Sequence, residues 1–67
     1  MKRAYETKVV VVTGAASGIG RATALLFARG HAMLVLTGRR QGALEELACE
    51  CEHLGARTLV IAADVTD

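Results

Sequence analysis

The chain has 67 residues, a formal net charge of +1 and 52% hydrophobic residues, with one Tyr, one Phe and no Trp. This length allows one small domain or part of a larger one, and the hydrophobic content excludes a chain that is disordered by composition. The near-neutral charge gives no electrostatic reason to expect binding to nucleic acid or to an acidic membrane surface. We therefore expect a folded chain with neither of these partners.

Residues 5–8 (Tyr-Glu-Thr-Lys) are polar at the place where a signal peptide needs an apolar run. The longest apolar stretches, residues 9–12 and 32–36, are too short to span a bilayer. Cys49 and Cys51 are too close in sequence for an ordinary disulfide. These features predict a reduced, soluble, cytoplasmic protein.

The first half of the sequence predicts a strand, a turn and a helix. Residues 8–13 contain four consecutive valines, a pattern typical of a strand buried on both faces in a parallel sheet. Residues 14–18 follow as a turn. From Ile19 the apolar residues recur at helical spacing, and Gly30 is a suitable end for this helix. The residues that share its apolar face are Ile19, Ala22, Thr23, Leu26 and Phe27.

The second half predicts a strand over residues 32–37, a helix from about residue 42 to 54 and a strand over residues 57–62. Gly55 is expected to stop the helix. The buried side of this helix is expected to hold Leu44, Leu47, Ala48, Cys51 and Leu54.

The alternation of elements predicts an α/β fold, namely the N-terminal β-α-β-α-β half of a Rossmann-like doubly wound parallel sheet. The strand order in such a sheet is 3-2-1-4, so the strand of residues 9–12 is internal in the complete sheet. In a chain that stops at Asp67 this strand becomes an exposed edge of valines. We expect the isolated 67-residue chain to be partly unfolded or to self-associate through this strand.

The stretch "TGAASGIG", between the first strand and the first helix, has the composition of a phosphate site. A helix N-terminus presents backbone N–H groups and the positive end of its dipole. Gly14 allows a sharp turn, Gly18 leaves room for a pyrophosphate and Gly20 lets the helix pack closely, while Ser17 adds a hydroxyl donor. The spacing matches neither G-x-G-x-x-G nor a P-loop. A turn that only connects strand and helix is the alternative.

The spacing T-G-x-x-x-G-x-G, matched by Thr13, Gly14, Gly18 and Gly20, resembles the short-chain dehydrogenase/reductase family. The likeness covers essentially the whole sequence, but only the adenosine half of the family's cofactor site. It implies that residues 1–67 are the incomplete N-terminal part of a single NAD(P)-binding Rossmann domain. It also implies a nicotinamide dinucleotide and a small-molecule carbonyl or alcohol substrate as ligands, and a parent protein that forms a homo-oligomer.

In the family that the sequence resembles, the end of the second strand selects the cofactor. An acidic residue there binds the ribose 2′-hydroxyl and favours NAD. Here Gly38 takes that position and Arg39 follows it. An arginine can bind a 2′-phosphate and stack on adenine, so NADP is expected in preference to NAD. Arg40 either shares this role or is a solvated charge at the start of a helix.

The resemblance extends to "AADVTD", where Asp64 matches an aspartate that hydrogen-bonds the adenine amino group and Val65 would pack against the ring. A solvated loop aspartate is the alternative. The cofactor-binding residues implied by the resemblance are Gly14, Ser17, Gly18, Ile19, Gly20, Arg39, Arg40, Asp64 and Val65.

One departure from the family pattern concerns His31. Relatives commonly have a glycine at this place, whereas here the glycine is Gly30, one residue earlier. Either the first helix ends one residue sooner, or His31 adopts a left-handed conformation.

The family's catalytic residues, a Tyr with a Lys four residues later together with a Ser and an Asn, have no counterpart in this sequence. The only tyrosine is Tyr5, and the residue four positions later is Val9. No metal site is expected from Cys49, Cys51 and His53, because Cys51 falls on the buried side of its helix. We expect Glu45, Glu46, Glu50 and Glu52 to form a solvated helix face.

These patterns predict the cofactor-binding N-terminal segment of an NADP-dependent oxidoreductase of the short-chain dehydrogenase/reductase type. Such an enzyme interconverts a carbonyl and an alcohol by hydride transfer. The 67 residues alone are expected to be inactive. The alternative is a non-catalytic nucleotide-binding module or an inactive truncated product.

Overall fold

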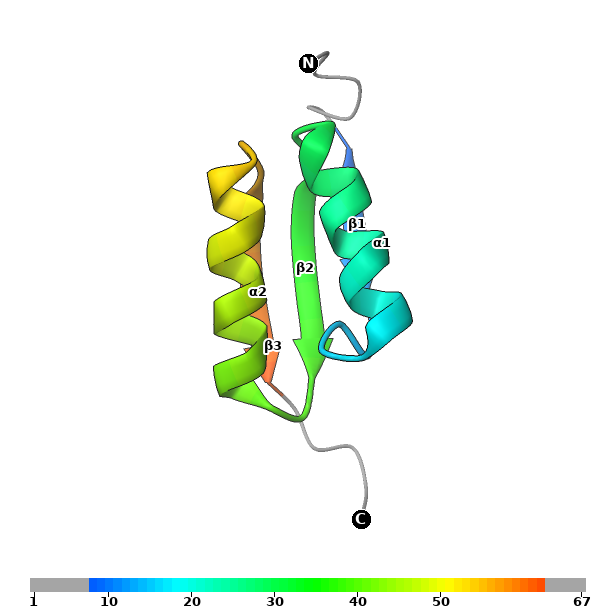
Figure 1. Cartoon of the computed structure of the whole chain (residues 1–67), viewed down its shortest axis with the longest axis vertical. Coiled ribbons are helices and arrows are strands. Elements are labelled where there is room, and N and C mark those ends of the chain that lie inside the picture. The colour runs from blue at the N-terminus through cyan, green and yellow to red at the C-terminus, as the bar shows by residue number, and fades with distance from the viewer. Residues whose placement is uncertain (1–7, 63–67) are drawn as a thin grey trace.

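A computed structural model describes residues 8–62 and contains two helices packed against a three-stranded sheet (Figure 1). The order of the elements confirms the predicted β-α-β-α-β arrangement, with ends that differ from the expected ones by at most one residue. The elements are β1 (Val9–Val12), α1 (Gly18–Arg29), β2 (Met33–Gly38), α2 (Gln41–His53) and β3 (Arg57–Ala62).

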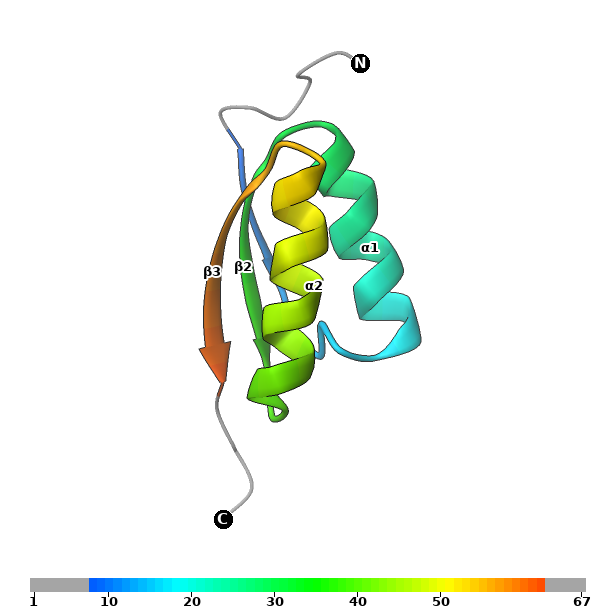
Figure 2. The ribbon, with the colours of Figure 1, turned by 60° about the vertical axis from the view of Figure 1, so that its left-hand side comes forward.

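The sheet has the order β1-β2-β3, and both strand pairs are parallel. Val11 is in register with Val35, and Val35 is in register with Leu59. Both helices lie on the same face of the sheet (Figure 2). The fold is therefore the N-terminal half of a Rossmann-like parallel sheet, as predicted.

The two faces of the sheet differ in what covers them. Val12, Leu34 and Leu36 point toward the helices and are buried. Val9 and Val11 point to the other face and are 68% and 60% exposed. The prediction that the valine strand is buried on both faces is thus wrong for this structure, because side chains alternate along a strand and both helices pack on one side.

Among the described residues β1 pairs only with β2, so it is the edge strand that the topology predicts. Within residues 8–62 no strand lies beside the outer backbone groups of β1, and such groups can pair with another chain. Self-association through β1 stays a prediction.

α1 lies against the sheet through small residues. Its buried positions are Gly20, Ala24 and Ala28, which recur every fourth residue along one side of the helix. Ile19 and Leu26 are 84% and 60% exposed, so the predicted apolar face is wrong at these positions, whereas Phe27 packs partly buried against the core. Small side chains let the backbone of α1 approach the sheet closely. The larger apolar residues of the helix lie to the side of this contact.

α2 buries four of its five predicted residues, namely Leu44, Leu47, Ala48 and Cys51. Leu54 is the C-cap residue and remains 37% exposed, because it lies beyond the last turn. Burial of Cys51 raises the pKa of its thiol to about 11.

No helix within residues 8–62 is long and apolar enough to cross a membrane.

Both helices end in the same hydrogen-bonded turn, a Schellman motif. At the end of α1 the N–H of His31 donates to the carbonyl of Ala28 at 2.9 Å, and the N–H of Ala32 donates to that of Phe27 at 3.3 Å. Gly30 is the C-cap, and His31, with φ of 67°, holds the left-handed position. Gly30 has φ of −91°, so the helix does not end one residue sooner, and the second alternative, a left-handed His31, is the one that holds.

The corresponding residue after α2 is Gly55, with φ of 104°. Its N–H donates to the carbonyl of Glu52 at 3.0 Å. A Cβ added to Gly55 would lie only 2.6 Å from Nε2 of His31, so the two helix ends pack against each other.

Replacing Gly55 by Ala should lower the free energy of unfolding by about 1–2 kcal/mol, because Ala does not favour a positive φ. Gly42→Ala is the matched control, since a Cβ at this position in α2 meets nothing within 4 Å. The control should raise the free energy of unfolding by roughly 0.5–1 kcal/mol. Urea denaturation of the full-length protein measures the free energy of unfolding of both variants. Equal effects of the two substitutions would contradict the assignment of a left-handed conformation to Gly55 at the end of α2.

Candidate functional site

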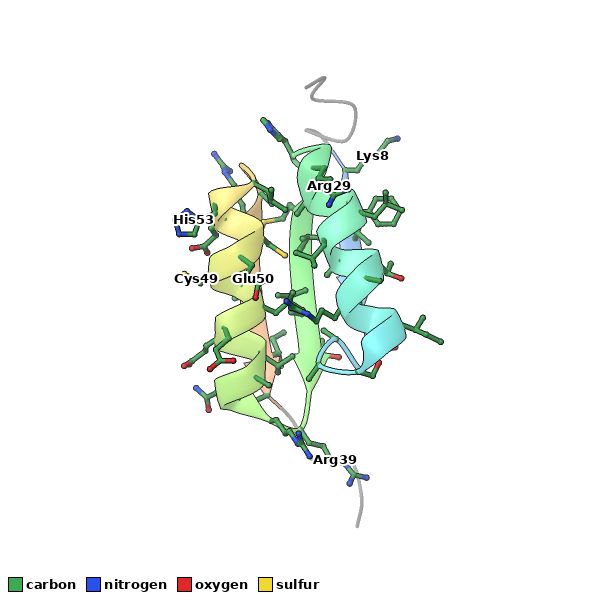
Figure 3. All side chains as sticks on the ribbon, viewed as in Figure 1. Lys8, Arg29, Arg39, Cys49, Glu50 and His53 are labelled. Atoms are coloured by element: carbon green, nitrogen blue, oxygen red, sulfur yellow. The ribbon has the colours of Figure 1, made fainter. Side chains whose placement is uncertain are left out.

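The loops that follow β1 and β2 meet at one edge of the sheet, because the carboxyl ends of parallel strands lie side by side. They enclose an open cleft of about 650 Å³. Figure 3 shows Arg39 at this end of the molecule. The cleft is lined by Thr13, Gly14, Ala16, Ser17, Thr37, Gly38, Arg39 and Arg40.

The first wall is the glycine-rich turn. Gly14 has φ of 61°, a conformation that L residues with a side chain rarely adopt, so it makes the sharp turn that the sequence predicts. The N–H of Ala15 donates to the carbonyl of Thr37 at 3.0 Å. This hydrogen bond joins the turn directly to the end of β2, and it therefore holds the two walls of the cleft together.

Ser17 caps the N-terminus of α1. Its hydroxyl donates to the carbonyl of Gly14 at 2.7 Å and accepts from the N–H of Gly20 at 3.2 Å. A serine hydroxyl has a single proton, and here that proton is engaged with Gly14. In this structure Ser17 thus stabilises the turn and the first turn of the helix.

Gly20 and Gly18 differ in what surrounds them. A Cβ on Gly20 would lie 2.9 Å from the carbonyl carbon of Gly14 and 3.0 Å from Cα of Ala15. The backbone of α1 therefore touches the turn where Gly20 lies, which is the close packing that the sequence predicts. A Cβ on Gly18 would meet nothing within 4 Å.

The second wall is formed by the end of β2 and the start of α2. Arg39 and Arg40 are exposed, and Arg40 is the N-cap residue of α2 without a side-chain capping hydrogen bond. Neither α1 nor α2 has an acidic residue in its first turn. Two helix N-termini and two arginines thus converge on one edge, which makes the cleft attractive to anions.

Four of the predicted site residues line the cleft together, namely Gly14, Ser17, Arg39 and Arg40. Gly18, Ile19 and Gly20 lie beside it in the first turn of α1 but do not line it. Asp64 and Val65 lie outside the described residues.

Ala16 and Thr37 also line the cleft, although the sequence pattern did not assign them to the site. The signal for Thr37 was its place at the end of the second strand, beside the glycine-rich turn. The signal for Ala16 was its place inside that turn.

The cysteines and the glutamates of α2 lie outside the cleft. Cys49 is exposed and Cys51 is buried, and residues 8–62 hold no cluster of three His, Cys, Asp or Glu side chains suited to a metal. The glutamates of α2 are exposed as expected. Glu50 is not merely solvated, however, because Nη2 of Arg21 donates to both of its carboxylate oxygens.

Gly20→Ala should lower the free energy of unfolding by more than about 1 kcal/mol, because the backbone of the turn cannot move away as a flexible side chain can. Gly18→Ala is the matched change in the same helical turn and should leave stability equal or slightly higher. Thermal unfolding of the full-length protein compares the two variants. A Gly20→Ala variant as stable as Gly18→Ala would show that α1 does not press on the turn.

The comparison with known proteins identifies a family. The sequence model of a family described as "short chain dehydrogenase" matches residues 8–67. The chain is 47% identical over 62 residues to the 1-deoxy-11-beta-hydroxypentalenate dehydrogenase of Streptomyces arenae, a match that covers 92% of this chain and 22% of that protein.

Solved structures give the same result. The L-sorbose reductase of Gluconobacter frateurii, complexed with NADPH and L-sorbose, is 42% identical with a TM-score of 0.84, over 97% of this chain and 25% of that one. A 3-oxoacyl-[acyl-carrier protein] reductase with bound NAD from Brucella melitensis is 33% identical with a TM-score of 0.87, over 98% and 26%. The chain thus spans about a quarter or less of the length of these proteins. It belongs to the short chain dehydrogenase family.

Proposed function

We propose that residues 1–67 are the N-terminal part of a single NAD(P)-binding Rossmann domain in an NADP-dependent oxidoreductase that interconverts a carbonyl and an alcohol. The observation that carries this proposal is the cleft between the glycine-rich turn and Arg39-Arg40. The chain matches only 22% of the length of the Streptomyces arenae dehydrogenase, which supports its being one part of a longer enzyme.

The glycine-rich turn would hold the pyrophosphate of the dinucleotide. Gly14 is required by its positive φ and Gly20 by its contact with the turn, whereas a Cβ added to Gly18 would meet nothing within 4 Å among the described residues. The space next to Gly18 would admit the pyrophosphate to the N–H groups at the start of α1. Ile19 follows Gly18 in this turn and is 84% exposed, so a ligand there would cover it.

The second wall supports NADP in preference to NAD. Gly38 carries no carboxylate that would repel a 2′-phosphate, and the guanidinium groups of Arg39 and Arg40 line the cleft beside it. The positive end of the α2 dipole adds to their attraction. The related structures contain NADPH in one case and NAD in the other, so the preference rests on these residues. Asp64 and Val65 keep their predicted roles at the adenine.

Hydride transfer itself is the chemistry of the nicotinamide ring. The residues of this chain would bind and orient the adenosine and pyrophosphate part of the cofactor. The Tyr, Lys, Ser and Asn that the family resemblance assigns to catalysis have no counterpart here. We therefore expect no dehydrogenase activity from residues 1–67 alone.

Arg39→Ala in the full-length protein should weaken NADPH binding about tenfold or more and change NADH binding little, because only NADPH presents a phosphate to this guanidinium. Fluorescence titration of both reduced cofactors measures the two dissociation constants. Arg29→Ala is the control, since it removes an exposed arginine at the opposite end of the molecule (Figure 3). Equal losses for NADPH and NADH in Arg39→Ala would refute the assigned role.

A further inference from the structure

An ion pair joins the first turn of α1 to the third turn of α2. Nη2 of Arg21 lies 2.8 Å from Oε1 and 2.9 Å from Oε2 of Glu50. Figure 3 shows Glu50 on the side of α2 that faces α1. Neither residue lines the cleft between the glycine-rich turn and Arg39-Arg40.

Arg21 is connected to the wall of the cleft through its backbone. Its N–H donates to the carbonyl of Ser17 at 2.8 Å. The hydroxyl of Ser17 in turn bonds the backbone of Gly14 and of Gly20. The guanidinium of Arg21 is thus attached to the segment whose N–H groups face the candidate ligand.

Apolar contacts contribute little to holding the first turn of α1 in place. The residues that α1 buries fully are Gly20, Ala24 and Ala28, each with one carbon or none in its side chain, and the larger Leu25 and Phe27, which pack partly buried against the core, lie in later turns of the helix. The large side chains of Ile19 and Leu26 are mostly exposed. Since buried apolar area scales with side-chain size, the first turn of α1 gains little from burial, and a polar link to α2 matters more there.

The pair lies along the seam between the two helices. Arg21 and Glu50 line a groove of about 220 Å³ together with Ala15, Ala16 and Leu47, among others. Both charges also act on the buried thiol of Cys51, whose pKa is raised first by burial and then by Glu50, and is lowered by Arg21. With side chains 44% and 47% exposed, the two charges are only partly screened by water.

We propose that Arg21 and Glu50 are a positioning pair for the dinucleotide site, which hold the glycine-rich turn and the first turn of α1 in the arrangement that binds the pyrophosphate. The inference rests on the proposed function. When the pair is broken, the binding arrangement is populated less, and the apparent affinity falls by the same fraction. Because the pyrophosphate is common to both cofactors, NADPH and NADH are affected alike.

The decisive variant is Glu50→Gln in the full-length protein, with the dissociation constant of NADPH measured by fluorescence titration. Removing a negative charge near a phosphate site would, by electrostatics alone, tighten the binding of the anionic cofactor. Loss of positioning predicts the opposite, a weakening of about three- to tenfold. The opposite signs separate the two effects.

Glu46→Gln is the matched control. Glu46 lies one turn earlier on α2 and lines the same groove, so the variant removes the same charge from nearly the same place without cutting the ion pair. It should bind NADPH as well as the unchanged protein or slightly better. Arg21→Lys keeps the positive charge but replaces the guanidinium donor by an ammonium group. Its loss of NADPH affinity should be smaller than that of Arg21→Gln, but still measurable.

The double variant Arg21→Gln with Glu50→Gln should weaken binding no more than the worse single variant, because the two residues act as one link. The proposal is overturned if Glu50→Gln binds NADPH as tightly as Glu46→Gln. It is also overturned if the losses of NADPH affinity in the single variants multiply in the double variant, or if the variants change NADPH and NADH affinity by different factors. If Glu50→Gln does not fold, the graded series Arg21→Lys and Arg21→Gln decides, and equal affinities in that series overturn the proposal. An unchanged protein that binds neither cofactor would contradict the proposed function instead.

Discussion

The contact between the backbone of α1 and the glycine-rich turn is the constraint on which the rest of the site depends. At Gly20 there is no room for a Cβ beside the carbonyl group of Gly14. This close approach brings the start of α1 to the end of β1 and lets Ser17 bond both glycines. The hydrogen bond from Ala15 to Thr37 then joins the turn to β2. A few backbone contacts therefore determine the shape of one whole wall of the cleft.

The same topology brings positive charge to the opposite wall. Parallel strands joined through helices on one face place the N-termini of α1 and α2 at the same edge of the sheet (Figure 1). Arg39 and Arg40 lie at that edge, and no acidic residue occupies the first turn of either helix. The chain has a formal net charge of only +1, so the positive character of the cleft comes from local arrangement rather than from composition.

The sequence predicted the element order, the glycine-rich turn and the buried side of α2, because each depends on local pattern or on glycine chemistry. The predictions from sequence failed where burial depends on how neighbouring elements pack. The valines of β1 are apolar on both faces, and the pattern alone does not reveal that both helices lie over one of them. For α1, large apolar residues marked the wrong face, since the close contact requires Gly20, Ala24 and Ala28. Thr37 in the cleft and the Arg21–Glu50 pair between the two helices depend on segments far apart in sequence, which spacing does not bring together.

The proposal that the cleft between the glycine-rich turn and the end of β2 holds the phosphates of NADPH can be tested by titrating the isotope-labelled full-length protein with NADPH and following backbone amide resonances by NMR. We expect the largest shifts at Gly14, Gly18 and Arg39, and little change at Gly55 and Arg57, at the opposite end of the sheet. Saturable binding of NADPH that leaves the amides of the glycine-rich turn unshifted would contradict it.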